Sequence, residues 1–219
     1  MNSEKLITKD IPTLRLSNSG LEALSLMQEF HLSHLAVVEN NSLKGLLSEE
    51  LIWNMHDQNN DISTVADKLE LNFEQAERDI FEIINYMNRH NLSLLPILAK
   101  EKYIGSISRQ SLVSALASIS AIQESGGVIV LKMKKMDYSM SEISQIIEGN
   151  NAKILSAFVT DVDDNDIIKL TIKLNIIDIA PIIQTFERFN YTVFASYNYS
   201  ETNDSLSDRY DSLMRYLNP

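Results

Sequence analysis

Two of the four histidines, His31 and His34, have a spacing that can place two imidazoles on one side of a helical turn. Imidazole nitrogens bind transition metals, but a metal site needs further ligands such as carboxylates. Only Glu29 and Glu39 lie nearby in the sequence. We therefore expect these histidines to cap or pack against loops, and we expect no metal site.

A second group of polar residues surrounds two serines, Ser48 and Ser108, each at the start of an expected helix. A serine hydroxyl there can accept hydrogen bonds from free backbone N–H groups, and a helix start also favours anions. Arg109 follows Ser108, and an arginine can bind a phosphate through two parallel hydrogen bonds. Three lysines lie close by, for which solvation in turns is an equally good explanation: Lys44, Lys100 and Lys102.

Signatures of catalysis and of calcium binding are missing from the sequence. It contains no G-x-S-x-G, P-loop, G-x-G-x-x-G or H-E-x-x-H motif. The acidic run 161–166 fails the EF-hand template, because Asp166 and Ile172 stand where that loop needs Gly and Glu. It falls between two expected strands, where Asp and Asn favour a turn. We therefore predict a protein that is not an enzyme and requires no cofactor.

The 219-residue chain is acidic, with 30 Asp and Glu against 19 Lys and Arg and a net charge of -11. This charge repels nucleic-acid phosphates and anionic membranes, so we expect neither as a partner. The chain has no cysteine, which excludes disulfides, Cys-zinc sites and thiol nucleophiles. The first ten residues lack the apolar core of a signal peptide, and the longest uncharged stretch, 110–123, is too short to span a bilayer. We expect a cytoplasmic location.

An internal repeat organises the first half of the chain. Shifting the sequence by 60 residues aligns segments 27–52 and 87–112 without a gap. In each copy, apolar residues at helical spacing precede an apolar run, a polar turn, a second apolar run and a second helix. We therefore predict two copies of a helix–strand–turn–strand–helix unit. The identical pairs are Met27/Met87, Leu32/Leu92, Ser33/Ser93, Leu35/Leu95, Gly45/Gly105 and Ser48/Ser108.

The repeated segments, LAVVENNSLKGLLSEELI and LLPILAKEKYIGSISRQSLV, resemble a tandem pair of CBS domains. In that family a G-h-h-T/S-x-x-D pattern follows the second strand, and two units pack through their sheets, leaving clefts that often hold adenosine nucleotides. Gly and Ser of the pattern match in both copies, whereas Leu51 and Ser111 stand at the position of the ribose-binding Asp. The nucleotide-binding residues that this resemblance implies are Gly45, Ser48, Gly105, Ser108, Arg109 and Ser111.

The second half has a different pattern, and Gly126-Gly127 in front of it favours a hinge. Strands are predicted at 128–135, 153–160, 167–174 and 191–199, and helices at 140–149 and 178–189. This βαββαβ order is the ferredoxin-like split unit. The order and the segment VIVLKMKKMDYSMSEISQIIEGNNAKI resemble an ACT domain, a small regulatory module that often binds amino acids where the first strand meets the first helix. The resemblance implies an amino-acid site at Asp137, Ser139 and Met140.

We thus predict an α+β chain in three parts. A pseudo-twofold CBS pair occupies residues 1–125, with units at about 6–60 and 66–122, an ACT-like domain follows at 128–199, and a polar loop and helix complete the chain at 200–219. The helix, 207–217, repeats apolar residues at helical spacing and either docks on its own chain or exchanges onto a partner subunit. Its apolar residues are Tyr210, Leu213, Met214 and Leu217.

The whole arrangement resembles the acetoin-utilisation-type CBS regulatory proteins, and the resemblance implies a homodimer. Two functions stay open. In the first, an adenosine nucleotide binds in the CBS cleft of a non-catalytic sensor, and the ACT-like domain transmits the change to an unidentified protein partner. In the alternative, the CBS sites are degenerate and the protein is a ligand-free dimerisation or docking scaffold. An amino acid in the ACT-like domain with empty CBS clefts is an intermediate case.

Overall fold

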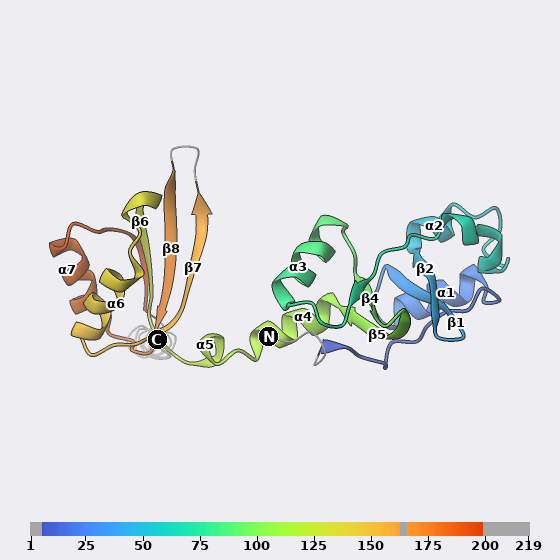
Figure 1. The fold of residues 1–219 in the computed structure, drawn as a ribbon, viewed down its shortest axis with the longest axis horizontal. Coiled ribbons are helices and arrows are strands. Elements are labelled where there is room, and N and C mark those ends of the chain that lie inside the picture. Colours follow the sequence, from blue (N-terminus) through green and yellow to red (C-terminus); the bar gives the residue numbers. More distant parts are fainter. Residues whose placement is uncertain (1–5, 163–165, 199–219) are drawn as a thin grey trace, which may run out of the picture. The chain divides into compact units, whose positions relative to one another are not determined.

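The computed structural model of the protein describes residues 6–162 and 166–198 (Figure 1). The chain divides into two compact units, Met1–Ala117 and Ser118–Pro219. The sequence-based prediction placed residues 118–125 with the repeats, but in the structure they group with the second unit. The predicted C-terminal helix at 207–217 and the tip of the acidic run lie outside the described residues. None of the helices in the described ranges has the length and apolar content that a transmembrane segment needs.

The α-helices and hairpin strands of the first unit repeat at the 60-residue interval. Its elements are α1 (Gly20–Glu29), β1 (His34–Glu39), β2 (Ser42–Ser48), α2 (Glu49–Trp53), a 3-10 helix (Ile62–Lys68), β3 (Glu74–Gln75), α3 (Ile80–Arg89), β4 (Leu94–Ala99), β5 (Lys102–Ser108) and α4 (Arg109–Ala117). Both hairpins carry an irregularity at the same place, after Val37 and after Ile97. The turns repeat as well, since His31 and Asn91 both have positive φ angles near 50°. The predicted helix–strand–turn–strand–helix unit is confirmed.

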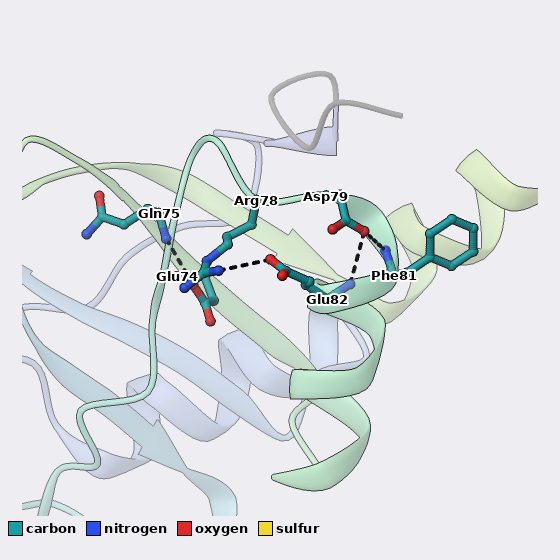
Figure 2. Close-up of polar contacts among 6 residues, drawn as sticks. All are labelled: Glu74, Gln75, Arg78, Asp79, Phe81 and Glu82. Atoms are coloured by element: carbon teal, nitrogen blue, oxygen red, sulfur yellow. Dashed lines mark hydrogen bonds and ion pairs between the residues drawn. The ribbon is translucent and has the colours of Figure 1, made fainter.

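The first helix of each copy starts at a side-chain cap. Ser19 and Glu22 form a capping box at α1. At α3, Asp79 accepts hydrogen bonds from the backbone N–H groups of Phe81 (2.8 Å) and Glu82 (3.2 Å), as Figure 2 shows. Each cap satisfies N–H groups that lack a partner within the helix. Ser19 and Asp79, which precede the apolar pattern of each helix, thus define where α1 and α3 begin.

The two copies share part of their core. One apolar cluster belongs to the first copy and contains Met27 and Leu35. The other is built mainly from the second copy, including Ile83 and Met87 of α3, but it also takes in Ala36 from β1 and Leu46 from β2. Burying apolar surface is the main favourable term in folding. The hairpins of the two copies therefore hold each other in place, and this contact positions the cleft described below.

Two features near the boundary between the two units differ from the sequence prediction. The last helix of the repeats ends at Ala117, and a separate short helix, α5 (Ser120–Gln123), follows it. Gly126 and Gly127 are buried. A Cβ on Gly126 would lie 1.8 Å from the carbonyl oxygen of Leu174, and one on Gly127 would lie 2.5 Å from a methyl group of Ile179. The hinge prediction is wrong, because these glycines allow close packing at the start of the second sheet.

The second unit is a four-stranded antiparallel sheet in the order β7-β8-β6-β9. Its elements are β6 (Val128–Lys134), a 3-10 turn (Lys135–Asp137), α6 (Met140–Gly149), β7 (Ile154–Val162), β8 (Ile167–Leu174), α7 (Ala180–Arg188) and β9 (Thr192–Tyr197). Helices α6 and α7 pack on one face of the sheet (Figure 1). Alternate residues of β8 point into this core, as the period-2 pattern predicted.

A candidate ligand-binding cleft between the repeats

The two repeats meet at equivalent serines, which contact each other directly. The backbone N–H of Ser33 donates to the hydroxyl of Ser93 at 3.0 Å. From the other side, the backbone N–H of Ser93 donates to Nδ1 of His34 at 3.3 Å. Both serine hydroxyls also lie near this nitrogen, at 3.0 Å for Ser33 and 3.1 Å for Ser93. Residues 33 and 93 correspond across the 60-residue repeat, so equivalent positions of the two copies meet here.

His34 is held as a neutral ring at this junction. A backbone N–H can only donate, so Nδ1 accepts and the ring proton is on Nε2. Burial is the largest influence on the His34 side chain and lowers its pKa below the ordinary value. The negative charge of Glu70 acts in the opposite direction, and Arg109 lowers the pKa further. The junction therefore lies within electrostatic range of residues from the segment that joins the copies and from the second copy.

A cleft of about 600 Å³ opens beside this junction, next to the first of the two predicted serines. Residues of both repeats form its walls, so the cleft exists only because the copies are paired. The first copy contributes most of the lining, and the second copy contributes the residues that precede β4. The lining residues are Ser33, His34, Ser48, Glu49, Glu50, Trp53, Asn54, Glu70, His90 and Asn91.

Three carboxylates make this cleft acidic, namely those of Glu49, Glu50 and Glu70. Trp53, the one tryptophan of the chain, is 61% exposed, and its Nε1 donates to a Glu49 carboxylate oxygen at 3.3 Å. Arg109 brings one positive charge near the cleft, but its guanidinium donates to the Asn91 side chain at 2.8 Å. Carboxylates accept hydrogen bonds from hydroxyl and cationic groups and repel phosphates. An exposed indole offers a surface on which a flat ring can stack.

Ser48 and Leu51 occupy the positions that the family pattern gives to Ser/Thr and Asp. The Ser48 hydroxyl accepts from the backbone N–H of Leu51 at 3.1 Å and so caps α2. Leu51 packs against the core of the first copy. The structure thus brings Ser48 to the cleft, whereas Leu51 contributes only apolar contact and cannot bind ribose hydroxyls.

Ser108 and Ser111, the corresponding pair of the second copy, bond to each other. Ser108 is buried, and its hydroxyl accepts from the Ser111 backbone N–H at 3.1 Å. The Ser111 hydroxyl in turn donates to the Ser108 carbonyl oxygen at 2.8 Å. These internal bonds satisfy much of the polar capacity that a ribose would need.

Gly45 and Gly105 face neighbouring backbone segments, and both have positive φ angles, +154° and +150°. A Cβ on Gly45 would lie 2.6 Å from the Leu69 Cβ, and one on Gly105 would lie 2.5 Å from an Ile7 methyl group. The segments that cross here are fixed by backbone hydrogen bonds to Leu46 and Ser106, the residues that follow the glycines. Close packing of these segments explains both glycines without a ligand.

The CBS domain family model matches residues 4–52 and 75–118, which correspond to the two copies. The first unit is a tandem pair of CBS domains. Such pairs are generally regulatory or ligand-sensing modules.

Several solved structures have a fold similar to part of this chain. A CBS domain pair/ACT domain protein from Thermotoga maritima is 22% identical over 53% of this chain and 96% of that chain, with a TM-score of 0.46. The CBS domains of a transcriptional regulator from Streptococcus pneumoniae are 15% identical over 52% and 98%, with a TM-score of 0.45. A candidate acetoin utilization protein (AcuB) from Vibrio cholerae is 20% identical over 56% and 95%, with a TM-score of 0.48.

A second cavity of the CBS pair lies at the hairpin turns and has a different chemistry. It measures about 620 Å³ and is lined by residues of the N-terminal segment and of both hairpins. Two lysines stand among apolar and neutral side chains, so this cavity favours anions. The lining residues are Lys9, Ile11, Pro12, Thr13, Asn41, Lys102, Tyr103 and Ile104.

The predicted amino-acid site lies at the junction of β6 and α6 in the second unit. Ser139 caps α6, accepting from the Glu142 backbone N–H at 3.4 Å, and Met140 packs partly against the core. Tyr191 donates to a Glu142 carboxylate oxygen at 2.9 Å. Burial, this hydrogen bond and the charges of Glu142 and Asp137 raise the pKa of Tyr191 to about 12. The structure thus places Asp137, Ser139 and Met140 close together in the chain around a helix start.

Sequence reasoning missed most of the cleft that the CBS pair forms. Glu70 and Asn91 are separated from Ser48 along the chain, and no motif connects them. One signal was present, because Ser33 and Ser93 are identical in the repeat alignment and turn out to be in contact. The spacing of His31 and His34 is compatible with metal binding, but the structure gives no support for a metal site there. Within the described residues, no group of three or more His, Cys, Asp or Glu side chains is suited to a metal ion.

Proposed function

We propose that the protein is a non-catalytic regulator that senses a small adenosine-type ligand in the Ser48 cleft of its CBS pair. The observation that carries this proposal is the cleft of about 600 Å³, whose walls come from both repeats. A ligand that touches both copies has a different affinity for each relative orientation of the copies. Only such a difference allows binding to shift a conformational equilibrium.

The charge of the cleft narrows the ligand class. Glu49, Glu50 and Glu70 can accept hydrogen bonds from ribose hydroxyls in place of the aspartate that Leu51 replaces, and Trp53 can stack on a base. The same carboxylates oppose phosphate groups. We therefore expect an uncharged or positively charged adenosine compound here, whereas phosphate groups fit better near Lys9 and Lys102 in the second cavity.

The second unit supplies the proposed output. Its βαββαβ order and antiparallel sheet are compatible with an ACT-like domain, which would transmit the change in the CBS pair to a protein partner. An amino acid at Asp137, Ser139 and Met140 is a second ligand to test. Assembly as a homodimer, membership of the acetoin-utilisation type and a cytoplasmic location stay predictions from the sequence.

The test is thermal unfolding with adenosine, S-adenosylmethionine, AMP, ADP and ATP. At a ligand concentration of a hundred times the dissociation constant, the stabilisation should be about 2.7 kcal/mol. We expect adenosine or S-adenosylmethionine to stabilise the first unit more than ATP does. Glu70→Gln should weaken the binding of S-adenosylmethionine and strengthen the binding of ATP. The control Glu148→Gln, which changes an exposed carboxylate of α6, should alter neither affinity.

The scaffold hypothesis has its own supporting observations. Leu51 packs against the core of the first copy, and the Ser108 and Ser111 side chains bond to each other. If none of the five compounds shifts the unfolding temperature at millimolar concentration, and the purified protein carries no nucleotide, the sensor proposal is refuted and the scaffold is favoured. Calorimetry against the twenty amino acids then tests the second unit separately.

A further inference from the structure

One face of the second unit's sheet carries large apolar side chains that the described residues leave exposed. Helices α6 and α7 cover the opposite face (Figure 1). On the open face, Phe158 and Phe194 are each 55% exposed and Tyr197 is 63% exposed. Strand register places Phe158, Thr171, Val130 and Ala195 in one row across all four strands. Exposed aromatic groups collected on one surface indicate a contact site.

The same face also carries three lysines. Lys132, Lys169 and Lys173 alternate with the buried residues of β6 and β8 and so lie on this side of the sheet. The ammonium group of Lys169 is 4.5 Å from the centre of the Phe194 ring, which also places Phe194 on this face. Lys173 donates to the carbonyl oxygen of Ile122 in α5 at 3.0 Å. A partner for this surface should therefore combine apolar and acidic groups.

The chain itself contains an amphipathic segment, 207–217, shortly after β9. The preceding residues 199–206 carry two carboxylates and no basic residue, whereas 207–217 balances two carboxylates with two arginines. The segment 207–217 presents Tyr210, Leu213, Met214 and Leu217 at the spacing of one helical face. We propose that this segment of the same chain packs as a helix on the open face of the sheet, with its apolar side over the row from Phe158 to Ala195.

The dimensions allow this. Eleven helical residues extend over roughly 16 Å, and a helix with its side chains is about 10–12 Å across. Four strands at about 4.8 Å spacing make a sheet whose width is similar to the length of this helix. The residues between Tyr197 and Ser207 can reach roughly 30 Å when extended, which is more than the distance from the edge strand β9 to the middle of the sheet. A tether of this length gives the segment an effective concentration in the millimolar range.

Cross-linking tests the proposal, because the chain has no native cysteine that could interfere. In the full-length chain, Thr171→Cys places a thiol in the centre of the open face, and Met214→Cys places one on the apolar side of the segment. Facing Cα atoms of a helix and a sheet lie farther apart than the roughly 7 Å that a disulfide allows, so a short bis-maleimide reagent is the suitable probe.

Two control pairs share one thiol each with this pair. Ser212→Cys with Thr171→Cys puts the second thiol on the opposite side of the segment. Glu148→Cys with Met214→Cys uses an exposed position of α6, on the covered side of the sheet. We expect roughly tenfold more intrachain product from the Thr171/Met214 pair than from either control. Circular dichroism of each variant establishes that the fold is retained.

Three results would overturn the proposal. Equal yields from all pairs would mean random collisions of a tethered segment. No product from the Thr171/Met214 pair would mean that the segment lies elsewhere. Linked dimers in place of intrachain product would show that the segment, or the sheet face itself, contacts a second copy of the chain.

Discussion

Replacing Gly105 by alanine tests whether the repeated glycines serve packing or ligand binding. Gly105 has a φ of +150°, and an added Cβ would lie 2.5 Å from an Ile7 methyl group and 2.8 Å from the Thr8 carbonyl oxygen. Thr8 cannot simply retreat, because it exchanges two backbone hydrogen bonds with Ser106, at 2.9 and 3.1 Å. The backbone conformation costs a non-glycine residue about 1–3 kcal/mol, and overpacking costs a similar amount.

Gly105→Ala should therefore destabilise the first unit by about 2–5 kcal/mol, which lowers its unfolding temperature by on the order of 10 °C. Calorimetry separates this transition from that of the second unit, which should not move. The matched control is Gly149→Ala in α6, where an added Cβ meets nothing within 4 Å. This change should stabilise the second unit by about 0.5–1 kcal/mol, because alanine favours a helix.

A change of less than about 0.5 kcal/mol in Gly105→Ala, the range of ordinary surface substitutions, would refute the packing explanation. If the variant instead kept its stability and lost affinity for an adenosine compound, the interpretation of Gly45 and Gly105 as nucleotide-binding residues would be correct. The two outcomes differ in the quantity that changes, so one protein preparation distinguishes them.

Three further variants test local features. Asp79→Ala removes the cap of α3 and should lower stability by about 0.5–2 kcal/mol in thermal melts, whereas no loss would mean that the cap is not formed in solution. Burial lowers the pKa of His34 in the folded protein, so the histidine takes up its proton at higher pH in the unfolded chain than in the folded one. The stability of the first unit should therefore fall as pH drops below about 6.5. His34→Gln should reduce this dependence of the unfolding free energy on pH. The pKa of Tyr191 is raised to about 12, so the second unit should lose stability as pH rises above about 10. This loss of stability should be smaller in Tyr191→Phe. In an ultraviolet titration of that variant, the tyrosine that ionises at the highest pH should be missing.

Much of the secondary structure could be predicted because it depends on local patterns. Helix α6 begins and ends at the predicted residues 140 and 149, and β8 spans the predicted 167–174. Both have an apolar period that matches their conformation, 3.6 for the helix and 2 for the strand. The repeat could be recognised for a similar reason, since a constant shift of 60 residues preserves turns, irregularities and caps together.

The cleft could not be predicted in the same way, because its walls come from separate parts of the chain. Glu70 follows the 3-10 helix, and Asn91 belongs to the turn before β4, so nothing in the sequence connects either residue with Ser48. The prediction of a hinge at Gly126 and Gly127 was wrong for a related reason. Paired glycines favour a hinge when solvent surrounds them, but here Leu174 and Ile179 pack where their side chains would be, and only the tertiary structure reveals those neighbours.

The symmetry of the backbone does not extend to the chemistry of the two CBS copies. Where the first copy has His34 and Glu49, the second has the buried Leu94 and Arg109. The exposed Trp53 corresponds to Val113, and Ser111 takes up the capacity of Ser108. A ligand suited to the acidic cleft beside Ser48 therefore finds no equivalent surroundings at the second copy. We expect calorimetry to give one adenosine-type ligand per chain; two equal sites would show that the backbone symmetry, rather than these side chains, decides binding.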